Sequence, residues 1–311
     1  MGQTIAVNKR PLLVVIAGPT ASGKTGVAIQ LARHFNTEIL SADSRQCYRE
    51  MNIGVARPST FELAQVPHHF IASHSIRDNV DAALYEELGL AILNHIFTTE
   101  DIAIAVGGTG LYIKALCEGI DPMPVIPEQV RREVRTMYGT QNLEAIQHRL
   151  KAIDPEYAMT GEMQNPQRVM RALEVVMATG KSIRHFQTKK NANRPFGVLY
   201  LGMELPKETL HERINLRVDK MVEEGLVEEV KGLLPFKTLN ALQTVGYREL
   251  FDYLEGKNTL ADAIALVKTH TRQYAKRQMT WFKKVAGMHW VAPDNIEEMV
   301  SLISRAKTKT P

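Results

Sequence analysis

Apolar residues follow two alternating patterns along the chain: short runs rich in β-branched residues, and longer stretches with helical spacing. The short runs predict strands at 12–17, 37–41, 102–106 and 198–203. The longer stretches predict helices at 24–34, 80–97, 110–117, 166–179, 207–232, 246–254 and 259–284. Strands that alternate with helices are typical of a parallel sheet flanked by helices, so we expect an α/β fold.

The alternation stops after Ile120, where a proline-rich stretch leads into a charged one without a predicted strand. We expect a small helical insertion domain there, at approximately 121–164, so that the core comprises 1–120 and 165–311. The core is expected to resume at Asn165, which suits an N-cap because Pro follows it at the first helical position.

The segment after the first predicted strand carries the clearest chemistry. It reads GPTASGKT and fits the P-loop pattern G-x-x-x-x-G-K-[ST], between a strand and a helix. Backbone N–H groups and the helix N-terminus would bind a phosphate or diphosphate, Lys24 would add a charge, and the Thr25 hydroxyl would ligate Mg²⁺. The residues expected to bind the diphosphate or nucleotide are Gly18, Pro19, Thr20, Ala21, Ser22, Gly23, Lys24 and Thr25.

Two other strand ends bear on what this loop binds. Asp43 follows one strand in a turn with Ser44, Arg45 and Gln46, where a carboxylate can bind Mg²⁺, act as a general base or simply cap a turn. The strand at 102–106 ends in Gly-Gly-Thr-Gly, whereas a P-loop ATPase has an Asp there to hold Mg²⁺. We expect this glycine loop to bring backbone and the Thr109 hydroxyl close to a ligand.

Basic residues gather on three predicted helices. Arg168 and Arg171 can clamp a diphosphate, or Arg171 can pair with Glu174 on a solvated face. Arg213 and Arg217 share one side of another helix. The stretch Lys268–Lys284 contains Arg272, Lys276 and Arg277, three aromatic residues and no Asp or Glu, which favours nucleic-acid contact over a merely solvated face.

Composition limits the class of protein. A chain of 311 residues with 44% hydrophobic content can bury one large core or two modest ones. Its net charge of +4 confines any nucleic-acid surface to a local patch. Two cysteines without metal spacing, no secretory leader pattern and no apolar run of membrane-spanning length predict a cytoplasmic protein with no membrane contact.

Seven segments, in order from residue 18 to 282, resemble the bacterial tRNA dimethylallyltransferase (tRNA isopentenyltransferase) family. They are GPTASGKT, SADSRQCYREMNIG, PHHF, VGGTGLYIKAL, NPQRVMRALEV, TVGYRE and TRQYAKRQMTWF. The resemblance implies transfer of a dimethylallyl group from dimethylallyl diphosphate to N6 of the adenosine 3′ of the anticodon in tRNA, with release of diphosphate. It implies Mg²⁺ as cofactor and the tRNA anticodon stem-loop as partner. We expect a monomer. Cys47 departs from the Val that is frequent there.

The resemblance also implies roles for individual residues. Asp43 would be the general base, with Thr109 near the reacting atoms and Lys24 and Arg217 on the diphosphate. Contacts to tRNA would come from Asp43, Ser44, Arg45, Gln46, Thr109, Arg131, Gln167, Arg168, Val169, Met170, Arg171, Gln243, Thr244, Val245, Gly246, Tyr247, Arg248, Arg272, Lys276 and Arg277.

Two other classes share the P-loop. A small-molecule or nucleoside kinase, which would bind ATP, needs an acceptor-hydroxyl pocket but no basic stretch at 268–284. A non-catalytic RNA-binding protein would tolerate the loss of Asp43.

Overall fold

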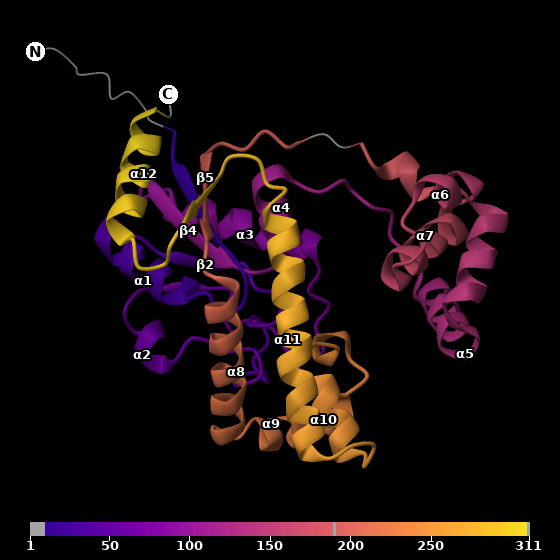
Figure 1. Cartoon of the computed structure of the whole chain (residues 1–311). Coiled ribbons are helices and arrows are strands. Elements are labelled where there is room, and N and C mark those ends of the chain that lie inside the picture. The colour runs from indigo at the N-terminus through magenta and orange to yellow at the C-terminus, as the bar shows by residue number, and fades with distance from the viewer. Residues whose placement is uncertain (1–9, 189–190, 310–311) are drawn as a thin grey trace, which may run out of the picture. The chain divides into compact units, whose positions relative to one another are not determined.

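The computed structural model describes residues 10–188 and 191–309, which form two compact units (Figure 1). Unit 1 comprises the described residues up to Gly119 and from Asn193 onward, and unit 2 spans Ile120–Ala192. Among the described residues no helix is both long and apolar enough to cross a bilayer.

A six-stranded parallel sheet forms the centre of unit 1, with the order β3-β2-β4-β1-β5-β6 in the described chain. Its strands are β1 (Leu12–Ala17), β2 (Ile39–Ser41), β3 (His68–His69), β4 (Ile102–Gly107), β5 (Gly197–Met203) and β6 (Met288–Val291). β1 is buried along its whole length, because it lies between β4 and β5 and both sheet faces are covered. The predicted α/β fold is confirmed.

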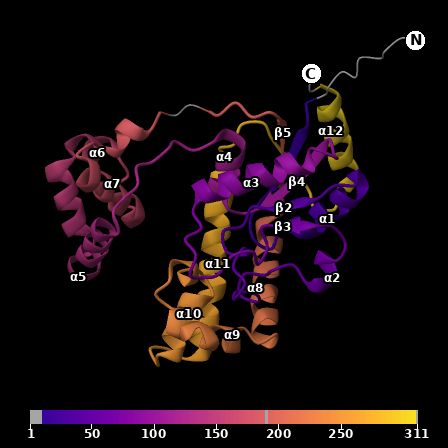
Figure 2. The same ribbon diagram turned by 180° about the vertical axis from the view of Figure 1, so that it is seen from behind.

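Helices cover the two faces of the sheet. On one side α1 (Lys24–Phe35) and α12 (Ile296–Lys309) pack together, and Leu31 and Ile303 belong to the same buried cluster as Ile16. The other side carries α3 (Ala82–Ile96) and α4 (Gly110–Glu118), and Figure 2 shows this pair from behind. The short α2 (Thr60–Leu63) precedes β3.

A group of helices extends beyond the carboxyl ends of the strands. It contains α8 (Lys207–Glu223), α9 (Leu226–Leu233), α10 (Tyr247–Leu254) and α11 (Leu260–Phe282), with α11 packed on both α8 and α10 (Figure 1). The prediction of one helix at 207–232 is wrong, because the chain takes a left-handed conformation at Gly225 (φ 99°) and α9 starts afresh.

Unit 2 is helical, with α5 (Glu128–Ile153), α6 (Pro155–Thr160) and α7 (Pro166–Thr179). We predicted that the core resumes at residue 165, but α7 belongs to unit 2. The reason is its apolar face: Val169, Leu173 and Val176 pack with Val134 and Leu150 of α5 in a core of their own. The insertion therefore ends at Ala192.

Candidate active site

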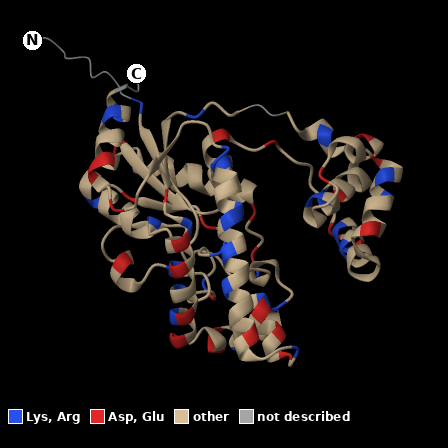
Figure 3. Cartoon of the chain, viewed as in Figure 1, with Lys and Arg blue, Asp and Glu red and all other residues tan. Residues whose placement is uncertain are grey.

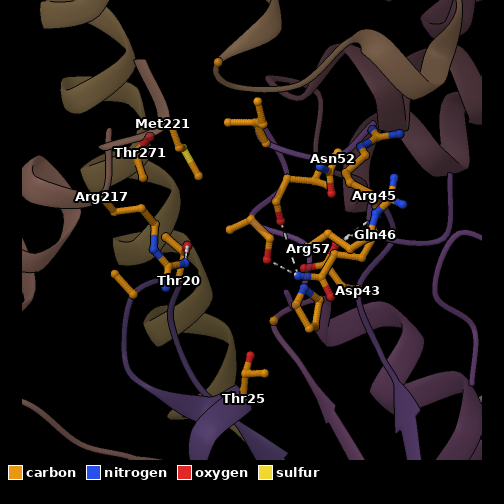
Figure 4. A pocket seen from close by; sticks show the side chains of 18 of the residues that line it. Thr20, Thr25, Asp43, Arg45, Gln46, Asn52, Arg57, Arg217, Met221 and Thr271 are labelled. Carbon is orange, nitrogen blue, oxygen red and sulfur yellow. Dashed lines mark hydrogen bonds between the residues drawn. The ribbon is translucent and has the colours of Figure 1, made fainter. Parts of the chain in front are cut away.

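A cavity of about 990 Å³ opens in unit 1 at the carboxyl ends of β1, β2 and β4, where ligands bind in open α/β sheets. Its walls come from the P-loop, the turn after β2, the loop 52–60, and helices α8 and α11. Arg217 and Thr20 lie on one side and Asp43, Arg45 and Gln46 on the other, with Thr25 at the base (Figure 4).

The P-loop forms as predicted. The chain turns at Gly23 (φ 90°), a conformation that favours glycine, and α1 begins at Lys24. The N-terminus of α1 thus borders the cavity, with the Thr25 side chain in its first turn. The Ser22 hydroxyl is buried without a hydrogen-bond partner among the described residues, as expected of a loop that awaits an acceptor-rich ligand.

Three cations surround the P-loop. Lys24 Nζ donates to the carbonyl of Pro19 at 2.5 Å. Burial, and next the charge of Arg217, lower the pKa of Lys24 to about 7, against a smaller opposite effect of Asp43. Arg217 donates to the Thr20 hydroxyl at 3.4 Å, and Arg213, one turn earlier on α8, lies beside Gly23. Burial lowers the pKa of Arg217. This cluster has the charge and geometry to bind a diphosphate.

Asp43 both caps a turn and faces the cavity. Its Oδ1 accepts hydrogen bonds from the backbone N–H groups of Arg45 (2.9 Å) and Gln46 (3.3 Å). Within the described chain Oδ2 has no hydrogen-bond partner, so one oxygen fixes the side chain and the other is available for a substrate proton.

The Gly-Gly-Thr-Gly segment at the end of β4, which we predicted to approach a ligand, also packs closely against other parts of unit 1. A Cβ on Gly107 would lie 2.1 Å from the carbonyl oxygen of Ala42, and one on Gly110 would lie 2.2 Å from Trp281 Nε1. The Thr109 hydroxyl accepts from the Ser44 N–H (3.0 Å) and donates to Ser44 Oγ (3.3 Å). Thr109 therefore holds the turn that carries Asp43.

Two further residues of α11 bear on the site: Gln278 was not singled out from the sequence, and Tyr274 was noted only as one of the aromatic residues in the basic stretch. Gln278 is buried; its Oε1 accepts from the Thr20 N–H and its Nε2 donates to the Gly108 carbonyl, both at 2.9 Å. It thus joins the P-loop to the glycine loop. Tyr274 lines the cavity, and burial, with the Asp43 charge second, raises its pKa to about 12, so it remains a neutral donor at pH 7.

A family model for IPP transferase matches residues 46–285. The chain belongs to the IPP transferase family. The tRNA dimethylallyltransferase of Cytophaga hutchinsonii is 42% identical over 291 residues, 94% of this chain and 96% of the relative. That of Flavobacterium johnsoniae is 46% identical over 284 residues, 89% and 92% of the two chains. Both relatives carry the name tRNA dimethylallyltransferase, which is the family that the sequence motifs indicated.

Solved structures show the same IPP transferase architecture. The crystal structure of a tRNA isopentenylpyrophosphate transferase from Bacillus halodurans superposes with a TM-score of 0.72 at 34% identity, over 96% of this chain and 98% of that one. A eukaryotic dimethylallyltransferase, described as acting on tRNA, superposes with a TM-score of 0.73 at 27% identity, over 95% of this chain and 77% of that one.

Most of the site residues predicted from the P-loop pattern and from the resemblance line the cavity of unit 1. These are the P-loop from Thr20 to Thr25, Asp43–Gln46, Arg217, Gln243–Gly246, Arg248 and Arg277. Tyr247 is instead buried, with its hydroxyl on Glu229.

Figure 3 shows Lys and Arg residues along α11, and among the described residues some of them are paired while others are exposed. Lys268 pairs with Asp219 of α8 at 2.6 Å, and Arg272 donates to Asn215 at 2.7 Å. Lys276 and Arg277 are exposed, and Arg277 stacks on Tyr274. Lys268 is therefore engaged with an acid of α8 and does not belong to the exposed basic surface of α11.

Six of the predicted residues belong to unit 2. Arg168 pairs with Glu162 at 2.7 Å, and Arg171 lies 3.5 Å from Glu174, the ion pair weighed as an alternative. The side chains of Val169 and Met170 point into the core of unit 2, which excludes them as surface contacts. Arg131 is half-buried on α5, and Gln167 lies exposed in the first turn of α7.

A magnesium site would depend on the ligand. No group of three His, Cys, Asp or Glu residues suitable for a metal occurs among the described residues. Mg²⁺ is commonly held by one or two protein oxygens together with substrate phosphates. The Thr25 hydroxyl and the Ser22 hydroxyl, which has no partner within the described chain, fit such a site.

Proposed function

We propose that this protein transfers a dimethylallyl group from dimethylallyl diphosphate to N6 of the adenosine 3′ of the anticodon in tRNA, with release of diphosphate. The observation that carries the proposal is one cavity that holds a cationic P-loop on one side and the Asp43 carboxylate on the other, without an Asp at the end of β4. The names of the relatives support it.

The chain's own groups can perform each part of the reaction. The allylic C–O bond breaks as the N6–C bond forms, and the negative charge that develops on diphosphate is stabilised by Lys24 and Arg217. Asp43 accepts the proton that N6 loses, since the nitrogen lone pair is delocalised and a positioned base assists its attack. When bound, Mg²⁺ would add charge stabilisation at the diphosphate, held by Thr25.

The cavity volume of about 990 Å³ exceeds what a five-carbon diphosphate needs, so an extruded adenine can enter beside it. The exposed Lys276 and Arg277 would contact phosphates of the anticodon stem-loop. The protein would act as a monomer, in the cytoplasm where tRNA is found.

The test is transfer by the purified protein. An unmodified anticodon stem-loop is incubated with dimethylallyl diphosphate and Mg²⁺, and its nucleosides are analysed by mass spectrometry. We expect one dimethylallyl group on the adenosine 3′ of the anticodon and none when guanosine replaces it.

The kinase alternative is tested in parallel with γ-labelled ATP and candidate acceptors. It predicts label in an acceptor and no prenylated nucleoside. The absence of an Asp where β4 ends at Gly107 is the structural reason to expect no phosphoryl transfer.

A further inference from the structure

Glu229 of α9 has no part in the chemistry proposed above, yet its carboxylate accepts four hydrogen bonds. Oε2 accepts from the N–H groups of Asn52 (3.1 Å) and Ile53 (2.8 Å). Oε1 accepts from the N–H of Gly54 (3.0 Å) and from the Tyr247 hydroxyl (2.6 Å). A carboxylate only accepts, so it matches four donors in a way that a carboxamide cannot.

The loop that Glu229 holds, residues 52–57, is bound on its other side to the turn that carries Asp43. Gln46 Nε2 donates to the carbonyls of Val55 (3.2 Å) and Ala56 (2.9 Å). The backbone N–H of Gln46 donates to Asp43 Oδ1 at 3.3 Å. A continuous set of hydrogen bonds therefore leads from Glu229 through the loop to the Asp43 carboxylate.

The same carboxylate is bound to the segment expected to contact tRNA. Tyr247, within Gln243–Arg248, is fully buried, and a Cβ on Gly54 would lie 2.6 Å from its ring. Burial, with the Glu229 charge second, raises the pKa of Tyr247, so its hydroxyl stays a donor. Glu229 thus stands between the segment of Tyr247 and the loop behind Asp43.

We propose that Glu229 is a positioning residue of the transfer reaction. It fixes the loop 52–57, whose carbonyls hold the Gln46 side chain, and Gln46 in turn orients Asp43. Through its hydrogen bond with Tyr247, Glu229 also links the orientation of Asp43 to the position of the segment 243–248. The proposal rests on the proposed function, because it assigns Glu229 a part in the same reaction.

The experiment compares Glu229→Gln with Glu228→Gln in the full chain. Glu228 is the neighbouring exposed residue of α9 and pairs only with Lys231, at 3.7 Å, among described residues. Single-turnover transfer is measured at saturating tRNA and dimethylallyl diphosphate. We expect Glu229→Gln to slow transfer about 10- to 100-fold, the usual scale for a misplaced catalytic group, with unchanged affinity for dimethylallyl diphosphate. Glu228→Gln is expected to match the wild type.

A double-mutant cycle with Asp43→Asn separates positioning from general damage. If Glu229 acts through Asp43, adding Glu229→Gln to Asp43→Asn slows transfer little further. Fully multiplicative effects, or a wild-type rate for Glu229→Gln, would overturn the proposal. If Glu229→Gln does not fold, Tyr247→Phe replaces it in the same cycle. This variant removes one donor to Glu229 and keeps the ring, so a smaller loss of transfer rate is expected. Failure of the proposed function would look different, because the wild type itself would transfer nothing.

Discussion

At the scale of the residue, Lys24 has the clearest dependence on pH. Its pKa of about 7 means that in the ligand-free protein the ammonium loses its proton as pH rises above neutrality. A diphosphate binds the charged form, so donor binding above pH 7 takes up a proton. We compare the affinity of the wild type for dimethylallyl diphosphate with that of Lys24→Arg. The ratio of the two affinities should be constant below pH 7 and fall about tenfold per pH unit well above it.

Lys24→Arg is the reference because a guanidinium stays charged over this range, while ionisation of the donor itself cancels in the ratio. Calorimetric titration of both proteins from pH 6 to 9 makes the measurement. A ratio that does not change with pH would mean that Lys24 keeps its proton throughout.

The second prediction at this scale concerns the base. Asp43→Asn keeps an oxygen that can accept from the N–H groups of Arg45 and Gln46, so the turn should persist. We expect turnover at saturating substrates to fall about 10²-fold or more, with nearly unchanged donor affinity. Asp294→Asn, on the exposed loop before α12, serves as control. Near-normal turnover of Asp43→Asn would make this carboxylate purely structural.

Local motifs sufficed to locate Lys24, Thr25 and Asp43, because the P-loop and a strand-end turn specify their own geometry. Gln278 and Glu229 depend on partners far along the chain, which no local pattern reveals. One signal was present for Gln278. It shares a helix face with the buried Ala275 and Phe282, where an uncharged polar side chain needs a partner.

At the scale of the element, α11 offers a test of tRNA binding. Lys276 and Arg277 are exposed, whereas Lys268 is paired with Asp219. If the two exposed cations contact phosphates, replacing both by Ala should reduce the slope of log affinity for tRNA against log salt by about 2, one for each contact. Lys268→Ala should leave the slope unchanged.

Filter binding or fluorescence anisotropy at several salt concentrations gives these slopes, and donor affinity checks that the cavity is intact. An unaltered slope for the double variant would assign these residues to the solvated face of the helix.

The limits of the long amphipathic helix α11 and of the buried strand β1 were predicted closely, because the residues of each element follow one pattern. β3 has two residues and β6 four, too few for a periodic signal. The helix α7 was found, but its apolar face does not say which core it joins, so the end of the insertion was misplaced.

At the scale of the whole molecule, the chain leaves unit 1 close to the point where it returns. Arg194 pairs with Glu86 at 2.5 Å and donates to the carbonyl of Ala115 at 2.7 Å, near the end of α4. We expect that replacing residues 121–191 by a short Gly/Ser linker leaves a folded protein that binds dimethylallyl diphosphate, because every cavity residue belongs to unit 1. The Michaelis constant for tRNA should rise, since Arg131, Arg168 and Arg171 are removed.

Thermal unfolding and donor titration of the shortened protein make this measurement. Loss of donor binding in a folded variant would show that unit 2 contributes to the cavity.

The place of β1 between β4 and β5 has a consequence for biosynthesis. β1 can pair with β4 as soon as that strand has left the ribosome, but its other edge waits until unit 2 and then Gly197–Met203 have been made. At ordinary translation rates this delay after β4 is roughly 5 to 20 s, during which one edge of a wholly apolar strand has no neighbour. Unpaired apolar edges are sites of association between chains. Overproduction in a strain depleted of nascent-chain chaperones should therefore lose more of the full chain to aggregation than of the chain shortened by the linker.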